Sequence, residues 1–126
     1  MKARHTRQER GAVTAELALV LPILVAVTIG LVWLLSVGVA QIRAVDAARE
    51  TARAVARGDD VGEAVARGRQ VAPEGARVTV ATTNGQVVAT VSGQVAGPGG
   101  LFGFLPGVEV SADAVAVAEE SSGVSP

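Results

Sequence analysis

The chain lacks the side chains on which most enzymes depend. Its 126 residues include no cysteine, no tyrosine, one histidine and one tryptophan. Without cysteine there is no disulfide, no thiolate metal site and no cysteine nucleophile. The single histidine, His5, has no second imidazole with which to share acid–base or metal chemistry. We therefore expect no catalytic residues, no cofactor and no metal, and we interpret the protein as non-enzymatic.

The chain also lacks an excess of charge of either sign. Its 11 basic and 12 acidic residues leave a formal net charge of −1. The basic residues are spread along the chain and are not interleaved with aromatic residues, so we expect no nucleic-acid partner. The apolar content is nearly all Ala, Val and Leu. Any folded core must therefore be built from small side chains, each of which buries little area.

One long stretch of the sequence has no charge at all. Residues 17–40 form a run of 24 uncharged residues. As a helix this run is ~36 Å long, which is enough to cross a hydrocarbon core of ~30 Å. The residues before it form a polar, basic leader of the kind that is retained in the cytoplasm. We expect a single transmembrane helix that contacts membrane lipid.

The helical period continues beyond the uncharged run, and Gly58 offers a stop signal. We predict one helix from about Thr14 to Arg57, and a short second helix that Asp60 caps and Pro73 ends. The apolar residues that recur at steps of three and four, and that should face the protein core, are Ile42, Val45, Ala48, Ala52 and Val55.

From residue 76 the apolar pattern changes to a period of two. The runs "ARVTVATT" and "QVVATVSGQV" flank Asn84-Gly85, a strong hairpin signal, and "VEVSADAVAVAEE" alternates in the same way. The sequence therefore predicts an α+β fold: a long N-terminal helix, which is transmembrane and continues as an amphipathic helix, a short second helix, and a small three-stranded antiparallel sheet. The helices should cover the apolar face of the sheet.

This pattern divides the chain into five segments. We expect a basic leader at 1–11, the transmembrane and amphipathic helix at 12–57, the short helix and a linker at 58–75, the small β region at 76–120 and a flexible tail at 121–126.

The segment between the second and third predicted strands, "AGPGGLFGFLPG", holds both phenylalanines. No helix with Lys-Ser/Thr follows its glycines, so we interpret it as a loop and not as a phosphate site. Its large apolar side chains are expected to plug the end of the small core, and a docking patch is the alternative. These side chains are Leu101, Phe102, Phe104 and Leu105.

Glu16 directly precedes the uncharged run, where a carboxylate is energetically costly unless it has a partner. It lies five residues after Gly11. If the chain is cut after Gly11, the new amino terminus is Ala12, one helical turn from Glu16. The alternative is that Glu16 is a first-turn acid, favoured by the helix dipole at an interface.

The basic leader, Gly11, Glu16 and the uncharged run together resemble the class III signal of type IV pilins. More narrowly, "RGAVTAELALVLPILVAVTIGLVWLL" followed by "QIRAVDAARETARAVARGDD" is similar to the TadE-like family of minor pilins or pseudopilins in tight-adherence (Tad/Flp) pilus systems. The likeness is strong over the first half of the chain and loose over the valine-rich second half.

The resemblance implies a function and a set of partners. A prepilin peptidase would cut between Gly11 and Ala12, and Glu16 would pair with the amino terminus of a neighbouring subunit. The partners would be other pilin-like subunits and the pilus assembly machinery, in the bacterial cytoplasmic membrane. The basic residues do not decide the orientation, because four of them flank each end of the run: Lys2, Arg4, Arg7 and Arg10 before it, and Arg43, Arg49, Arg53 and Arg57 after it. The resemblance implies that the N-terminus is inside and the C-terminal region outside.

A second class of function is a signal-anchored or signal-cleaved exported binding module unrelated to pili. Gly38 and Ala40 are small residues that a signal peptidase accepts, with a cut before Gln41. The uncharged run is, however, longer than the ~7–15 apolar residues of an ordinary signal peptide.

Overall fold

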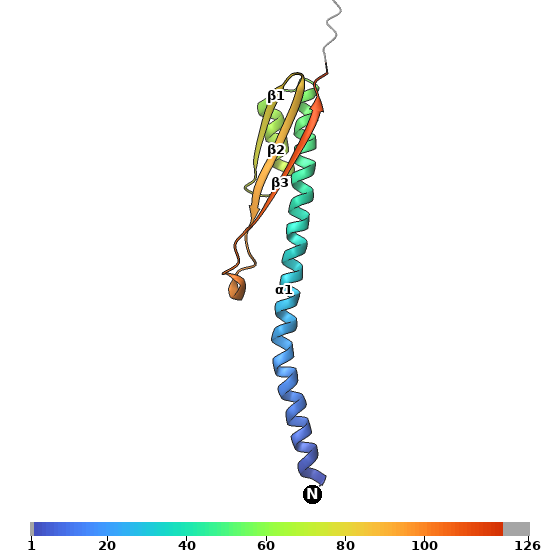
Figure 1. Cartoon of the computed structure of the whole chain (residues 1–126), viewed down its shortest axis with the longest axis vertical. Helices are drawn as coiled ribbons and strands as arrows, with labels where there is room; N and C mark the ends of the chain where they lie inside the picture. Colours follow the sequence, from blue (N-terminus) through green and yellow to red (C-terminus); the bar gives the residue numbers. More distant parts are fainter. Residues whose placement is uncertain (1, 120–126) are drawn as a thin grey trace, which may run out of the picture. The chain divides into compact units, whose positions relative to one another are not determined.

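The computed structural model describes the backbone of residues 2–119 and the side chains of residues 6–100 and 102–119. Its helices and strands follow in the order α1 (Lys2–Ala56), α2 (Val61–Val71), β1 (Arg77–Thr83), β2 (Gln86–Val95), the 3₁₀ turn η1 (Gly100–Phe102) and β3 (Val108–Val117) (Figure 1). The predicted α+β fold is confirmed. The flexible tail expected at 121–126 lies outside the described residues.

The chain divides into two units, residues 1–35 and residues 36–126. Unit 1 consists of the first part of α1. This helix begins at Lys2, well before the predicted start at Thr14. The leader and the uncharged run are therefore one continuous helix, and no break in the backbone marks Gly11. The leader is rich in Arg, Gln and Glu, which are good helix formers, and extending an existing helix is inexpensive.

Local chemistry fixes where α1 ends and α2 begins. Gly58 has φ +96°, and the amides of Gly58 and Asp59 donate to the carbonyls of Val55 and Ala54. This pattern is a Schellman motif, in which a left-handed residue satisfies the last helical carbonyls. The carboxylate of Asp60 then accepts a hydrogen bond of 3.2 Å from the amide of Glu63, which caps α2. The predicted stop and cap are both confirmed.

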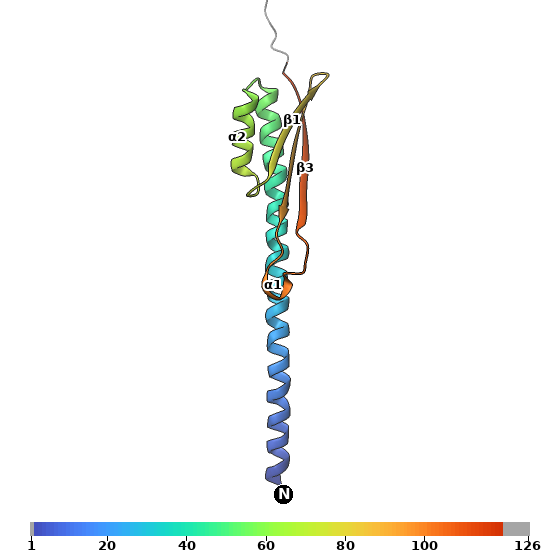
Figure 2. The same ribbon diagram turned by 90° about the vertical axis from the view of Figure 1, so that its left-hand side faces the viewer.

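The three strands form one antiparallel sheet in the order β1-β2-β3. Asn84 (φ 52°) and Gly85 (φ 74°) make the two-residue turn between β1 and β2, in which both central residues need positive φ. In unit 2, α2 and the second part of α1 lie on the same face of the sheet (Figures 1 and 2). No helix among the described residues lies against the opposite face of the sheet (Figure 2).

The core between these helices and the sheet is made of Ala and Val. On the sheet, Val78 and Val91 are opposite one another in the register and both are buried. Alanine side chains of α1 pack against them, and these small residues let the helix approach the strands closely. The buried members of this cluster are Ala44, Ala47, Ala48, Ala72, Val78 and Val91.

The face of α1 that packs on the sheet differs from the prediction. Ile42 is 62% exposed, while Ala44 and Ala47 are fully buried. Ala48 and Ala52 are buried as predicted, and Val45 and Val55 are half-buried at the flanks. The prediction followed the bulkier β-branched residues, but the contact selects the smallest side chains, because a helix that lies close to a sheet has no room for a large residue.

Candidate functional site

The three residues assigned to processing and subunit recognition all lie on exposed turns of α1. Gly11, Ala12 and Glu16 are exposed. No neighbouring atom would lie within 4 Å of a Cβ placed on Gly11. Ala12 and Glu16 are four residues apart, so their side chains lie one above the other on the same face of the helix. The structure therefore leaves Gly11 accessible and brings Ala12 and Glu16 onto a common face.

Glu16 has no ionic partner among the side chains that the structure describes. The ion pairs found there join Asp59 to Arg57 and to Arg67, far along the chain. Thr14, two residues before Glu16, bonds the carbonyl of Arg10 at 2.8 Å in its own helix. The Glu16 carboxylate is thus left for water or for a group outside the described part of the chain.

From residue 17 to residue 35 the surface of α1 carries no charge and is almost entirely apolar. The helix from Thr6 to Ala56 is long and apolar enough to cross a membrane, with a mean hydropathy of 2.7 in its most apolar window, and no part of that window is buried. A core helix of a soluble protein would be largely covered. The exposed large side chains of this part of α1 include Leu17, Leu19, Leu21, Ile23, Leu24, Leu31, Leu34 and Leu35.

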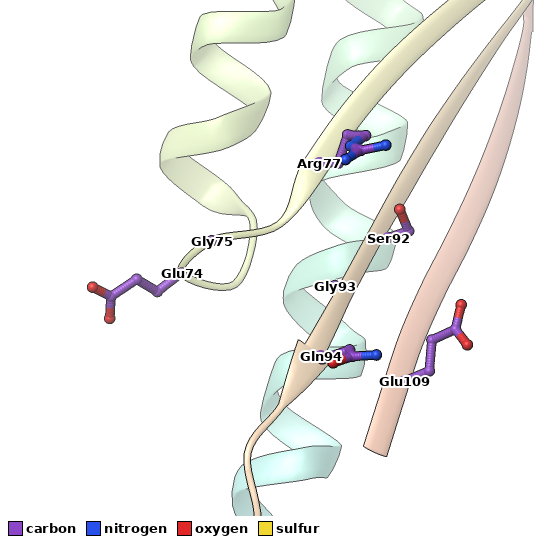
Figure 3. A pocket seen from close by; sticks show the side chains of 7 residues that line it. All are labelled: Glu74, Gly75, Arg77, Ser92, Gly93, Gln94 and Glu109. Atoms are coloured by element: carbon purple, nitrogen blue, oxygen red, sulfur yellow. The ribbon is translucent and has the colours of Figure 1, made fainter. Parts of the chain in front are cut away.

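A hollow lies on the sheet of unit 2. It has a volume of about 460 Å³ and is lined by residues of β1, β2, β3 and the segment before β1 (Figure 3). Ser92 lies opposite Arg77 in the register, and the Glu74 side chain points away from the other labelled side chains (Figure 3). Among the described residues no group of three or more His, Cys, Asp or Glu side chains could hold a metal ion. We assign no chemistry to this hollow.

The β2–β3 loop is arranged differently from the prediction. Phe104 is 79% exposed and Leu105 is 36% exposed, so Phe104 does not plug the core. Phe102 is half-buried, and the side chain of Leu101 lies outside the described residues. The loop is closed by tight turns whose glycines allow its two arms to approach each other, and this geometry turns Phe104 outward.

Comparison with known protein families finds one match, which lies within α1. Residues 11–53 match the TadE-like protein family. The resemblance predicted from the sequence is therefore confirmed over this segment. The TadE-like segment begins at Gly11, contains Glu16 and covers about a third of the chain. That family is a structural family associated with tight-adherence pili, and the similarity of this chain to it lies in α1. No curated protein and no solved structure matches the chain.

One contact of Gln41, within the matched segment, was not predicted from the sequence. The side-chain amide of Gln41 donates a hydrogen bond of 2.8 Å to the carbonyl of Ser111 on β3. The two residues are 70 positions apart, and nothing in either local sequence indicates the pairing. The contact fixes the first residue after the uncharged run against the sheet.

Proposed function

We propose that the protein is a minor pilin or pseudopilin of a tight-adherence pilus system, a non-enzymatic component that acts by assembly. This proposal rests on the TadE-like match. The matched segment begins at Gly11 and includes both Glu16 and the exposed apolar part of α1. A helix with so many exposed leucine, isoleucine and valine side chains needs lipid or other subunits around it.

The proposed anchoring follows from the helix. The uncharged run of α1 spans the bacterial cytoplasmic membrane, with the basic leader inside and unit 2 outside. The nearly equal basic flanks do not determine this orientation, so it rests on the family. In this arrangement α1 contacts lipid before assembly and other pilin-like subunits after it.

The proposed role of Glu16 follows from its lack of an internal partner. A prepilin peptidase cuts between Gly11 and Ala12 and creates a cationic amino terminus one helical turn from Glu16. In a bundle of subunits the carboxylate pairs with the amino terminus of a neighbour, because a charge enclosed by apolar helices is tolerated only when it is neutralised.

The exported-module alternative has less support. The TadE-like match extends across Ala40 and Gln41, where a signal peptidase would cut, and α1 is continuous through both residues. Ala40 is also buried in unit 2. No observation favours a cut at this place.

Intact-mass analysis of membrane-extracted protein tests processing. A mature chain that starts at Ala12 supports the proposal, whereas a start at Met1 argues against processing and a start at Gln41 supports the exported module. Gly11→Leu should block the cut, because a bulky side chain replaces the residue before the cleaved bond. Gly30→Leu is the matched control: it makes the same change on the same helix in open space, and it should leave the start at Ala12.

Co-purification with other pilin-like subunits tests the role of Glu16. Glu16→Gln should preserve insertion and processing but weaken association by about 3–5 kcal/mol if the pair is fully enclosed. Glu9→Gln is the control, since this exposed carboxylate lies on the same helix within the removed leader. Equal recovery of partners by Glu16→Gln and the unmodified protein would leave Glu16 as a helix-end residue and disprove the pairing.

A further inference from the structure

The β2–β3 loop is the most apolar exposed segment of unit 2. From Val95 to Val108 it contains no charged residue, and it carries both phenylalanines of the chain. The loop has a defined backbone: the amides of Phe102, Gly103 and Leu105 donate to the carbonyls of Gly99, Gly100 and Phe102 at 3.0–3.1 Å. It therefore holds Phe104 outward by its turns, at 79% exposure.

Two hydrogen bonds show how β3 runs relative to the second part of α1. Gln41 bonds Ser111, and the amide of Glu119 bonds the carbonyl of Ala56 at 3.0 Å. Along the helix the distance from Gln41 to Ala56 is ~22 Å, and along the strand the distance from Ser111 to Glu119 is ~26 Å. These lengths agree, so β3 runs alongside α1 in the same direction.

Because β3 runs alongside α1, the position of the β2–β3 loop along the axis of α1 can be worked out. Val108, the first residue of β3, lies ~10 Å before Ser111 along the strand. The loop therefore begins ~10 Å beyond Gln41 on the side of the uncharged run, which ends at Ala40. The other arm agrees, because Val95 and Ala96 line a hollow of about 520 Å³ together with Ser36, Val39 and Ala40 of α1.

The uncharged run is ~6 Å longer than a typical hydrocarbon core. An offset of ~10 Å from its end thus brings the base of the loop ~4–7 Å inside the outer edge of the hydrocarbon core, a depth typical of apolar groups that lie in the membrane interface. Large apolar side chains on a charge-free segment at this depth favour lipid over water.

We propose that the β2–β3 loop is a second membrane contact, in which Phe104 and Leu105 insert into the outer boundary of the bilayer beside the point where α1 leaves it. This inference rests on the proposed membrane span of α1. Lipid is what covers the loop. The loop has no charge with which to select a protein partner, and it lies at the end of unit 2 that faces the membrane. The contact ties unit 2 to the membrane surface at a second point.

Tryptophan fluorescence in vesicles tests the contact. The full chain is reconstituted in phosphatidylcholine and phosphatidylglycerol vesicles that carry bromine at a shallow or a deep position of the acyl chain. The native Trp33 reports on the span of α1. The loop is read in a Trp33→Phe background that carries Phe104→Trp, and the control carries Val115→Trp in the same background, at a site on β3 that is 61% exposed.

We expect the tryptophan at position 104 to lose most of its emission with shallow bromine and less with deep bromine, and the tryptophan at position 115 to keep its emission. Quenching of Trp33 without quenching at 104 would overturn the loop contact and leave the span intact. Equal quenching at 104 and 115 would also overturn it, because the sheet as a whole would then lie on lipid.

Two further outcomes also oppose the inference. If the emission at 104 is blue-shifted but unquenched, and the shift disappears when the protein is diluted in lipid, a second copy of the chain covers the loop. If Trp33 itself is unquenched, the membrane span fails, and the loop contact fails with it. Circular dichroism of each variant confirms that the helix and sheet content is retained.

Discussion

The two units of the chain use apolar side chains in opposite ways. In unit 1 every leucine is exposed, with exposed fractions between 55% and 70%. In unit 2 every buried apolar side chain among the described residues is Ala or Val. The helix of unit 1 thus exposes its large residues, and the core of unit 2 is made of small ones. In the proposed function, lipid or other subunits cover the surface that the chain leaves exposed in unit 1.

The two units should also differ in which amino-acid substitutions they tolerate. In the proposed membrane span of unit 1, an apolar residue needs only to remain apolar, because fluid lipid adapts to its shape. In unit 2 the volume of each residue matters, because fixed neighbours surround it. Substitutions of similar size should therefore have different consequences in the two units.

The largest effect is expected from a charge in unit 1. Leu31→Arg places a guanidinium near the middle of the uncharged run and should disfavour insertion by about 3 kcal/mol. The fraction of protein that stays in carbonate-washed membranes measures it. Val115→Arg, at an exposed site of unit 2, is the control and should change little. If the washed membranes retain neither the unmodified protein nor the Leu31 variant, this helix is not in the bilayer.

The next effect is a cavity in unit 2. Val91 is fully buried, so Val91→Ala should cost about 2 kcal/mol and lower the Tm by about 10 °C. Thermal unfolding of the full chain in detergent, followed by circular dichroism, gives the shift. Val115→Ala removes the same atoms from an exposed site and should leave the Tm nearly unchanged. Equal shifts for the two variants would contradict the assignment of the core.

A smaller effect is expected where α2 meets α1. A Cβ on Gly68 would collide with Oγ1 of the buried Thr51. Gly68→Ala should therefore cost about 1 kcal/mol, after the gain in helix propensity is subtracted from the clash. In a Thr51→Ala background the cost should disappear. Gly30→Ala in unit 1 has open space around it and should not destabilise the protein. A cost that persists without Thr51 would point to a different contact.

The smallest effect concerns the cap of α2. Asp60→Ala removes the acceptor for the Glu63 amide and should cost about 0.5 kcal/mol, because the cap is exposed. Asp60→Asn keeps an acceptor at the same place and should recover most of the loss. Denaturant unfolding with a shared m-value resolves a difference of this size. Identical stability of all three proteins would show that the cap contributes nothing.

Local chemistry explains which parts of the fold were predictable. The Asn84-Gly85 turn, the stop at Gly58 and the cap at Asp60 each depend on neighbours within a few residues, and each was predicted correctly. β3 could be predicted equally well, because a strand with one face on the core and the other in solvent has apolar residues at every second position. The TadE-like signature is also local, since Gly11, Glu16 and the apolar run lie on one helix.

The sequence by itself determined the types of the helices and strands, the turns between them and the family resemblance of α1, because spacing along the chain encodes all of these. Only the tertiary structure decided that α1 meets the sheet through Ala44 and Ala47 with Ile42 outside, that Gln41 bonds Ser111, and that Phe104 is exposed. Each of these depends on the distance between segments far apart in sequence, and on how much space two packed surfaces leave for a side chain. No periodicity within a single segment carries that information.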